Sequence, residues 1–257
     1  SLVTVQAYVT TNAGNIEHSF TNVPVKKNYR TNIVGNLISS TTDFVVKVND
    51  DWAGPDYKYD SENGKVYVEV GTVEELQNAI KDGVDNITLT ENITLDKPLV
   101  FGAPAQSPIA RASASETPSS FVLDLGGKTI TTDLQSEGRH YYAIDNYANL
   151  TIVGEGAINA RGIQNFGTMT IDGNITITNV DTNGGAAIWN EGNITINAGT
   201  FISGNPDIIV EGSYGAALNT RPSEEKETKA IVNGGTFIAY SQLTYAIINE
   251  GETIINN

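Results

Sequence analysis

One short pattern recurs along the second half of the chain and limits the folds open to it. In each copy a small residue and an aliphatic or alanine residue are followed by any residue and then by asparagine. The asparagines of the five copies are Asn146, Asn165, Asn190, Asn219 and Asn249. Segments of the type aliphatic-Thr-aliphatic or Met-Thr-aliphatic follow three of them, at 150–152, 169–171 and 194–196. One such repeat buries too little apolar surface to fold alone, so neighbouring copies must stack.

The segments between the turns show the alternation of short β-strands. Apolar residues alternate with Thr and Asn, which predicts strands, and Gly and Asn are typical of the turns between them. We therefore expect stacked coils of two or three strands, in which each strand bonds its counterpart about 4.8 Å above and below. The predicted inward columns are Ile144, Ile163, Ile188, Ala217 and Ile247, and Leu150, Met169 and Ile194.

The recurring asparagine is predicted at one corner of every coil. Its side-chain amide can bond the amides above and below, and Asn tolerates the left-handed backbone that a sharp corner favours. These five side chains are therefore expected to form a structural ladder: Asn146, Asn165, Asn190, Asn219 and Asn249.

The N-terminal part of the chain lacks the repeat. It contains stretches of alternating apolar residues separated by turn-forming residues, which predicts a small antiparallel β segment and a linker. We therefore expect two domains, residues 1–58 and residues 59–257. The chain opens at Ser1 without an initiator Met or an apolar leader, as a processed or trimmed chain does.

One helix is predicted near 72–82, where the repeats begin. Thr72 and Glu75 form a capping box, and Gly83 is placed to end the helix. An open parallel edge invites association, so an amphipathic helix here is expected to cover the first coil. Its predicted apolar face consists of Leu76, Ala79 and Ile80.

The composition excludes several classes of function. The chain has 257 residues with 30 acidic and 15 basic side chains, a formal charge of −15, no Cys and two His. An acidic chain repels phosphate, which argues against nucleic acid as a partner. A disulfide framework and a Cys-based zinc site are excluded as well. No apolar run of transmembrane length occurs, and we expect no metal and no cofactor.

Two parts of the chain resemble known families. Residues 23–37, VPVKKNYRTNIVGNL, resemble the closing strands of fimbrillin-like domains, which occur in surface lipoproteins and pilus subunits of the Bacteroidetes. The rest resembles the right-handed, pectate-lyase-like parallel β-helix class in its helix cap, its LDLGGKTI turn and its GNITI coils. Together these resemblances imply an all-β chain, in which a small antiparallel β segment precedes a right-handed parallel β-helix with an N-terminal capping helix. They also imply an adhesin-like protein that is extracellular or on the outer-membrane surface.

The β-helix class includes polysaccharide lyases and glycoside hydrolases, whose chemistry needs paired carboxylates or a calcium-binding acidic cluster beside a base. Asp145 is predicted on the outward face, and its neighbours in the stack are Gln164 and Trp189. That column continues into Leu218 and Ile248, so it offers no second carboxylate. We therefore assign no catalytic residue and keep a lyase or hydrolase as the alternative function.

An aromatic and polar cluster is the strongest candidate for ligand binding. Residues 139–142 read Arg-His-Tyr-Tyr, and with Trp189 they can offer a stacking platform for sugar rings. Tyr142 also fits a place in the core or at a strand flank. The candidate ligand-binding residues are His140, Tyr141, Trp189 and Asp145. A second candidate is a contact patch for a partner or a loop, the apolar outward column Trp189, Leu218 and Ile248.

The sequence favours a non-catalytic surface protein that presents an acidic face to a polysaccharide or to a host or partner surface protein. The alternatives are a lyase or hydrolase on the same scaffold and a structural spacer in a surface assembly. The oligomeric state is not specified. The last coil stops at Asn257, so we expect an end-to-end contact or a further segment there.

Overall fold

The structure is a computed structural model and is almost entirely β-strand. It describes residues 2–11, 14–25, 30–35, 44–49, 57–60, 62–102, 119–132, 142–180, 185–207, 215–223, 227–240 and 244–256. Within these ranges there is one α-helix, and most strands are parallel and lie in two sheets of 15 and 6 strands. The prediction of an all-β, mostly parallel fold is confirmed.

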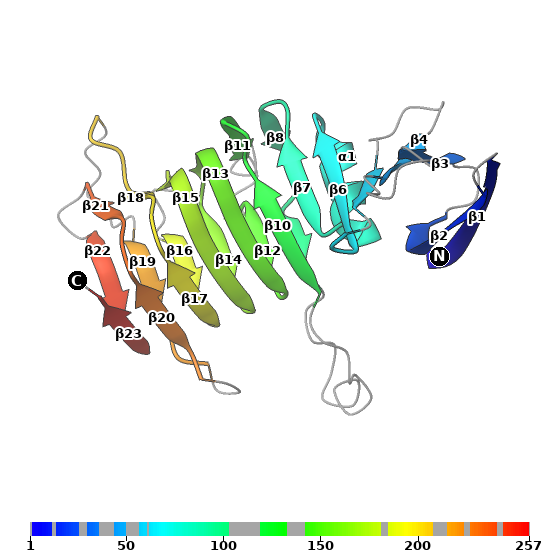
Figure 1. Ribbon diagram of the computed structural model, residues 1–257. Coiled ribbons are helices and arrows are strands. Elements are labelled where there is room, and N and C mark those ends of the chain that lie inside the picture. The colour runs from blue at the N-terminus through cyan, green and yellow to red at the C-terminus, as the bar shows by residue number, and fades with distance from the viewer. Residues whose placement is uncertain are drawn as a thin grey trace, which may run out of the picture.

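The parallel strands form three sets, and in each set a strand pairs with the strand one repeat later (Figure 1). The first set is β6 (Lys65–Val70), β7 (Asn86–Leu89), β10 (Ser120–Asp124), β13 (Asn149–Ala160), β15 (Thr168–Asn179), β17 (Asn193–Ile196), β20 (Lys229–Val232) and β23 (Glu252–Ile255). The second set is β8 (Ile93–Leu95), β11 (Lys128–Thr132), the second halves of β13 and β15, β18 (Thr200–Ser203) and β21 (Thr236–Ala239). The third set is β9 (Leu99–Phe101), β12 (Ile144–Asn146), β14 (Ile163–Asn165), β16 (Ala186–Asn190), β19 (Ala216–Thr220) and β22 (Tyr245–Asn249).

The chain visits the three sets in a fixed order. Strands β7, β8 and β9 are followed by β10, β11 and β12, and each of these pairs in parallel with the strand three places earlier. The long strands β13 and β15 each contribute to the first and second sets, so they replace two short strands. Successive repeats are therefore stacked one on another along the chain.

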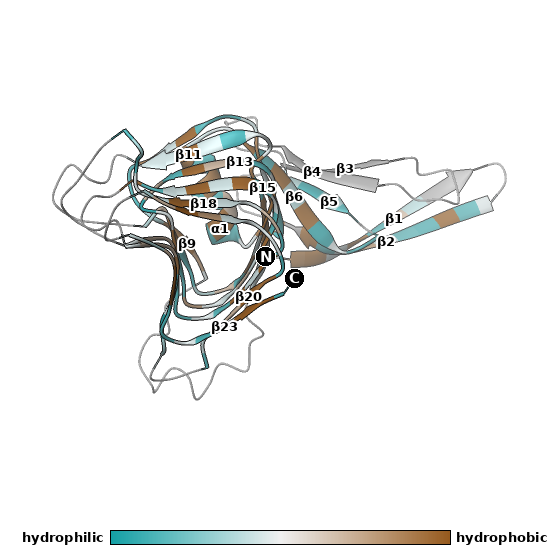
Figure 2. Cartoon of the chain, turned by 90° about the vertical axis from the view of Figure 1, so that its left-hand side faces the viewer, coloured by the Kyte–Doolittle hydropathy of each residue, from teal (hydrophilic) through white to brown (hydrophobic). Residues whose placement is uncertain are grey.

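The apolar side chains of all three sets meet in one interior. Figure 2 looks along the stack and shows the strands superimposed around this interior, with β1 and β2 projecting to one side. Met169 pairs with Leu150 on one side and with Ile194 on the other, and all three side chains are buried. Burying one such side chain contributes roughly 1.5–3 kcal/mol, so the interior columns are the main source of stability.

The register of the fourth repeat corrects the sequence prediction. Ile188 pairs with Leu218 rather than with Ala217, and Leu218 in turn pairs with Ile247. Leu218 is fully buried. Leucine removes more apolar surface from water beneath Ile188 than alanine does, so packing selects this register. Aligning the repeats on their asparagines missed the one-residue difference.

Helix α1 (Val73–Asp82) covers the N-terminal end of the stack, where it contacts β6, β8 and β9 (Figure 1). The Thr72 hydroxyl accepts from the backbone N–H of Glu75, the Glu75 carboxylate accepts from the backbone N–H of Thr72, and Gly83 ends the helix with φ 72°. The predicted capping box and stop signal are confirmed. Among the described residues, no helix is long and apolar enough to cross a bilayer. The buried face of α1 consists of Leu76, Ala79 and Ile80.

The N-terminal strands are antiparallel, as predicted. Strands β1 (Leu2–Thr11) and β2 (Gly14–Pro24) form a two-stranded sheet, and β3 (Arg30–Gly35), β4 (Phe44–Asn49) and β5 (Tyr57–Asp60) lead antiparallel into β6. Because β6 pairs in parallel with β7, one sheet continues from the antiparallel into the parallel part. The predicted domain boundary between residues 58 and 59 falls within β5. A second small core joins β2 to β5 through Phe20, Val23 and Tyr59.

Candidate functional site

The outward side of the third set carries two neighbouring columns of polar and aromatic side chains. One column comes from the middle of the strands, and the other from the residue just past each corner. Their spacing follows the strand separation, about 4.8 Å per repeat. We refer to the aromatic and charged side chains of these columns, together with the adjoining Tyr142 and Arg161, as the outer platform. Its members are Tyr142, Asp145, Tyr147, Arg161, Phe166, Trp189, Glu191 and Arg221.

Trp189 lies at the centre of the outer platform and is half-buried. Its indole Nε1 donates a 2.6 Å hydrogen bond to Oε1 of Glu191. The Arg221 guanidinium carbon lies 4.9 Å from the centroid of the indole ring, within the range of a cation–π contact. The ring of Tyr142 is 6.4 Å away and tilted by 56°. These three contacts hold the indole in one orientation.

Tyr142 supports the outer platform from beneath. It is only 8% exposed, and the guanidinium carbon of Arg161 lies 5.2 Å from its ring centroid. A sugar cannot stack on a ring that is covered in this way. The interpretation of Tyr142 as a buried residue therefore agrees with its exposure, and its ring also lies next to that of Trp189.

Tyr147 and Phe166 extend the aromatic surface along the stack. They occupy equivalent corners of successive repeats, and their rings are parallel within 9° with centroids 4.7 Å apart. That separation equals the strand spacing of about 4.8 Å, so the stacking follows directly from the repeat. Both side chains are half-buried.

Three ionisable groups gather on one part of the outer platform. Burial raises the pKa of Asp145 to about 6. Burial also raises the pKa of Tyr147, and the negative charges of Asp145 and Glu191 raise it further. Glu191 belongs to the corner column of Tyr147, two repeats further along, so the outer platform carries a second carboxylate outside the column of Asp145.

Arg221 closes the far side of the outer platform. Its Nε donates to Oε2 of Glu250 at 2.9 Å, and the two side chains are 44% and 47% exposed. An ion pair so exposed contributes only about 0–1 kcal/mol. The guanidinium can therefore exchange this partner for a ligand oxygen at little cost.

The structure describes two of the four predicted ligand-binding residues, Asp145 and Trp189. Trp189 and Asp145 lie in one column, two strands apart, with Gln164 between them. His140 and Tyr141 lie outside the described residues. The predicted apolar outward column does not form, because Leu218 points inward and Asn219 stands between Trp189 and Ile248. The sequence did not assign four corner residues of the outer platform to the ligand site: Tyr147, Phe166, Glu191 and Arg221.

The asparagine ladder forms over three repeats. Nδ2 of Asn146 donates to Oδ1 of Asn165 at 2.8 Å, and Nδ2 of Asn165 donates to Oδ1 of Asn190 at 2.7 Å. All three side chains are fully buried. The one-residue change of register then puts Thr220 beside Asn190, so Asn219 leaves the ladder.

The last predicted ladder residue and the predicted corner geometry also need correction. Asn249 pairs with Thr220 and is exposed, and its Oδ1 accepts from the Thr253 hydroxyl at 3.0 Å. None of the ladder asparagines has a left-handed backbone, and among the described non-glycine residues only Asn22 has a positive φ. Positive φ occurs at glycines before the third-set strands, such as Gly162 with φ 96°, and so at a different corner from the asparagines.

Metal-binding groups do not gather within the described ranges. There, no cluster of three or more His, Cys, Asp or Glu side chains is arranged to hold an ion. His18 lies on β2, where its ring is 6.3 Å from that of Phe20.

Comparison with known proteins gives one partial match. Residues 2–90 match the sequence profile of DUF6562, a family of unknown function. The matched part extends from β1 to the end of β7, and so includes the antiparallel strands, α1 and the first parallel strands. Comparisons with curated proteins and with solved structures find no match. The function must therefore be inferred from the residues.

Proposed function

We propose that this chain is a right-handed parallel β-helix that binds a glycan without cleaving it, as part of an adhesin-like protein on the cell surface. Three sets of parallel strands visited in fixed order, with α1 over the first repeat, support the β-helix. Crossover connections between parallel strands are right-handed in almost all proteins, which supports a right-handed winding of the coils. The resemblance of residues 23–37 to fimbrillin-like strands supports the surface location.

The observation that carries the glycan proposal is the fixed indole of Trp189, with the carboxylate of Glu191 beside it and that of Asp145 two strands away in the same column. A sugar ring stacks its C–H face on an indole, and a carboxylate accepts hydrogen bonds from hydroxyl groups. Glu191 holds the indole nitrogen and keeps further lone pairs for a ligand, while Asp145 lies in the same column as Trp189. Among glycans, a neutral one is favoured, because these carboxylates belong to a chain with a formal charge of −15.

The same surface favours a glycan over a host or partner protein. Protein interfaces usually have an apolar core, whereas the outer platform mixes aromatic rings with charged groups along its length. The apolar column that would have suited a protein partner is broken by Asn219, which is only 6% exposed.

A retention assay with immobilised neutral polysaccharides tests this function. The wild-type chain should be retained, and Trp189→Ala should weaken binding by about tenfold or more, because stacking and a fixed hydrogen bond are both lost. Tyr240→Ala is the matched control, since Tyr240 is 39% exposed and directly follows β21 of the second set. Equal retention of both variants would contradict the proposal, and a lack of any retention would favour a structural spacer.

One observation favours hydrolysis or lyase chemistry as a second candidate. A glycoside hydrolase needs a protonated carboxyl near neutral pH and a second, ionised carboxylate. Burial raises the pKa of Asp145 to about 6, and Glu191 is a second carboxylate on the same outer platform. Incubation with polysaccharides, with and without calcium, should release no reducing ends or unsaturated products if the chain only binds. Turnover that is lost in Asp145→Asn and in Glu191→Gln would establish the enzyme instead.

A further inference from the structure

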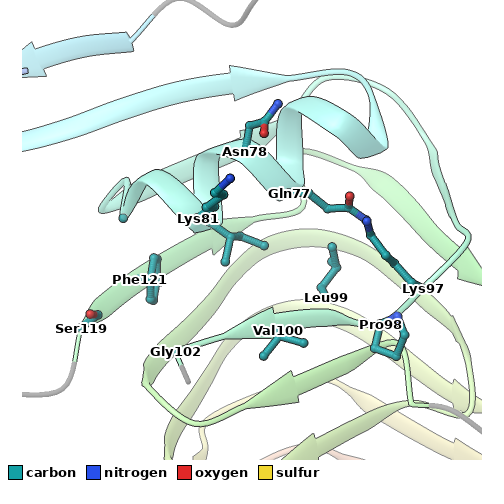
Figure 3. A pocket seen from close by; sticks show the side chains of 12 residues that line it. Gln77, Asn78, Lys81, Lys97, Pro98, Leu99, Val100, Gly102, Ser119 and Phe121 are labelled. Carbon is teal, nitrogen blue, oxygen red and sulfur yellow. The ribbon is translucent and has the colours of Figure 1, made fainter. Parts of the chain in front are cut away.

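A pocket of about 680 Å³ opens at the N-terminal end of the stack, next to α1 (Figure 3). One wall is α1, which contributes Gln77 and Lys81. The other walls are the segment leading into β9, with Lys97, and the start of β10, with Phe121. The volume lies within the roughly 300–1,000 Å³ that is typical of small-molecule sites.

The charge of this pocket is opposite to that of the chain. Lys81 and Lys97 are the only charged side chains among the described residues that line it, although the chain has 30 acidic and 15 basic residues. Both lysines are exposed, and within the described residues neither has an ion-pair or hydrogen-bond partner. The last turn of a helix favours a cation, which accounts for Lys81. It does not account for Lys97, which comes from a different wall.

A buried donor without an acceptor lies in the same pocket. Nε2 of Gln77 is shielded from solvent and has no hydrogen-bond partner in the part of the chain that the structure describes. Buried polar groups nearly always have a partner, and a ligand oxygen reaches this donor when a covering side chain such as the exposed Lys97 moves aside. In Figure 3 the side chains of Gln77 and Lys97 extend toward each other from opposite walls.

The same walls also carry apolar side chains. Ile80, Leu99 and Phe121 contribute side chains that are 9%, 1% and 3% exposed, and Pro98 adds its ring. An apolar wall beneath two ammonium groups and an amide donor suits a ligand with an apolar face and an anionic oxygen. Sugar acids and aromatic acids both have this form.

We propose that this pocket binds a compact ring-shaped carboxylate, whose oxygens accept from Gln77 and face Lys81 and Lys97. The carboxylate can belong to an acidic sugar unit of a glycan or to a free organic acid. Val100 lines the pocket and pairs with Asp145, so the pocket adjoins the outer platform one strand away. The proposal stands on the pocket alone and does not depend on glycan binding at Trp189.

An NMR titration of the whole chain with four probes tests the proposal. Galacturonate and benzoate carry the carboxylate, whereas galactose and benzyl alcohol are their neutral counterparts. Both carboxylates should shift the side-chain amide signals of Gln77, and the neutral probes should not. Galacturonate binding much more tightly than benzoate indicates a glycan source, and the reverse order indicates a free acid. Binding should weaken as ionic strength rises from about 0.01 M to about 0.15 M, since the Debye length falls from about 30 Å to about 8 Å.

Variants locate the binding in the pocket. Lys81→Gln with Lys97→Gln should raise the Kd for the better carboxylate by about tenfold or more, and arginine at both positions should preserve binding. Lys65→Gln is the matched control, an exposed lysine outside the pocket. Trp189→Ala should leave carboxylate binding unchanged, which separates this site from the outer platform. The proposal is overturned if neutral probes bind equally, if the double variant binds like the wild type, or if neither carboxylate shifts the Gln77 signals.

Discussion

The indole nitrogen of Trp189 donates a 2.6 Å hydrogen bond to the carboxylate of Glu191. The strand residue and the corner residue that follows it are thereby joined across the buried Asn190, which points into the interior between them. An aromatic face and an acid are fixed side by side on the outward surface. The following predictions start from this pair and from the ladder beneath it.

Replacing Glu191 should weaken neutral glycan binding without unfolding the chain. Glu191→Ala removes the partner of the indole and one acceptor for sugar hydroxyls, each worth about 0.5–1.5 kcal/mol. We expect the Kd to rise by about five- to tenfold, measured by isothermal titration calorimetry. Asp172→Ala is the control, because Asp172 is exposed on a different set of strands. A loss of affinity equal to that of the control would remove Glu191 from the site.

Asp145 should make stability fall as the pH rises. Its pKa in the folded chain is about 6, against an ordinary value of 3.8, so the folded state favours the protonated form. Ionising Asp145 in the folded chain costs no stability below pH 3.8, and this cost in the free energy of unfolding grows until the pH exceeds about 6. Asp145→Asn should therefore match the wild type near pH 3.5 and exceed it at pH 7 by about 1 kcal/mol, allowing for solvent screening of a half-buried carboxyl.

Urea unfolding of both proteins between these two pH values measures this difference. A constant offset at every pH would show that Asn changes packing rather than ionisation. A wild type that is more stable than Asp145→Asn at pH 7 would contradict the direction of the pKa shift.

Among the polar positions of the asparagine ladder, substitution of the middle one should lower stability the most. Asn165 accepts from Asn146 and donates to Asn190 and to the carbonyl of Asn193, so Asn165→Ala removes three buried or part-buried hydrogen bonds. Each lost bond contributes about 0.5–1.5 kcal/mol, and we expect a loss of about 2–4 kcal/mol in the free energy of unfolding. Asn219→Ala, which touches no ladder bond, should cost less than half of this. Chemical denaturation of the two variants decides whether the ladder ends before Asn219.

The pairing of Leu218 with Ile188 can be tested by substitution. Leu218→Ala opens a cavity beneath Ile188 and should cost about 2–5 kcal/mol. Ile254→Ala, at a position that is 37% exposed, should cost under about 1 kcal/mol. If the register followed Asn219 instead, Leu218 would face solvent and its replacement would be as mild as that of Ile254.

Several elements were predictable because local chemistry alone fixes them. The capping box of Thr72 and Glu75 and the αL residue Gly83 specify the start and end of α1 within a few residues. The period-two alternation around Met169 specifies a strand with that side chain buried.

The candidate site was harder to predict, because it consists of corner residues. Tyr147, Phe166, Glu191 and Arg221 share no residue type and follow no common motif. They become neighbours only because the strands before them are in register. The corner position after each asparagine was the one available signal, and it requires the register to be known first.

The sequence by itself determined that this chain stacks short parallel strands beneath a capping helix, because alternation, turn residues and helix caps act over a few residues. Tertiary structure alone decided that Leu218 rather than Ala217 pairs with Ile188, because the choice depends on the space left beneath Ile188. It also decided that Tyr147 and Phe166 occupy successive corners, and that Lys81 and Lys97 line one pocket. Charges and rings far apart in the sequence interact only after the register has set the distances between them.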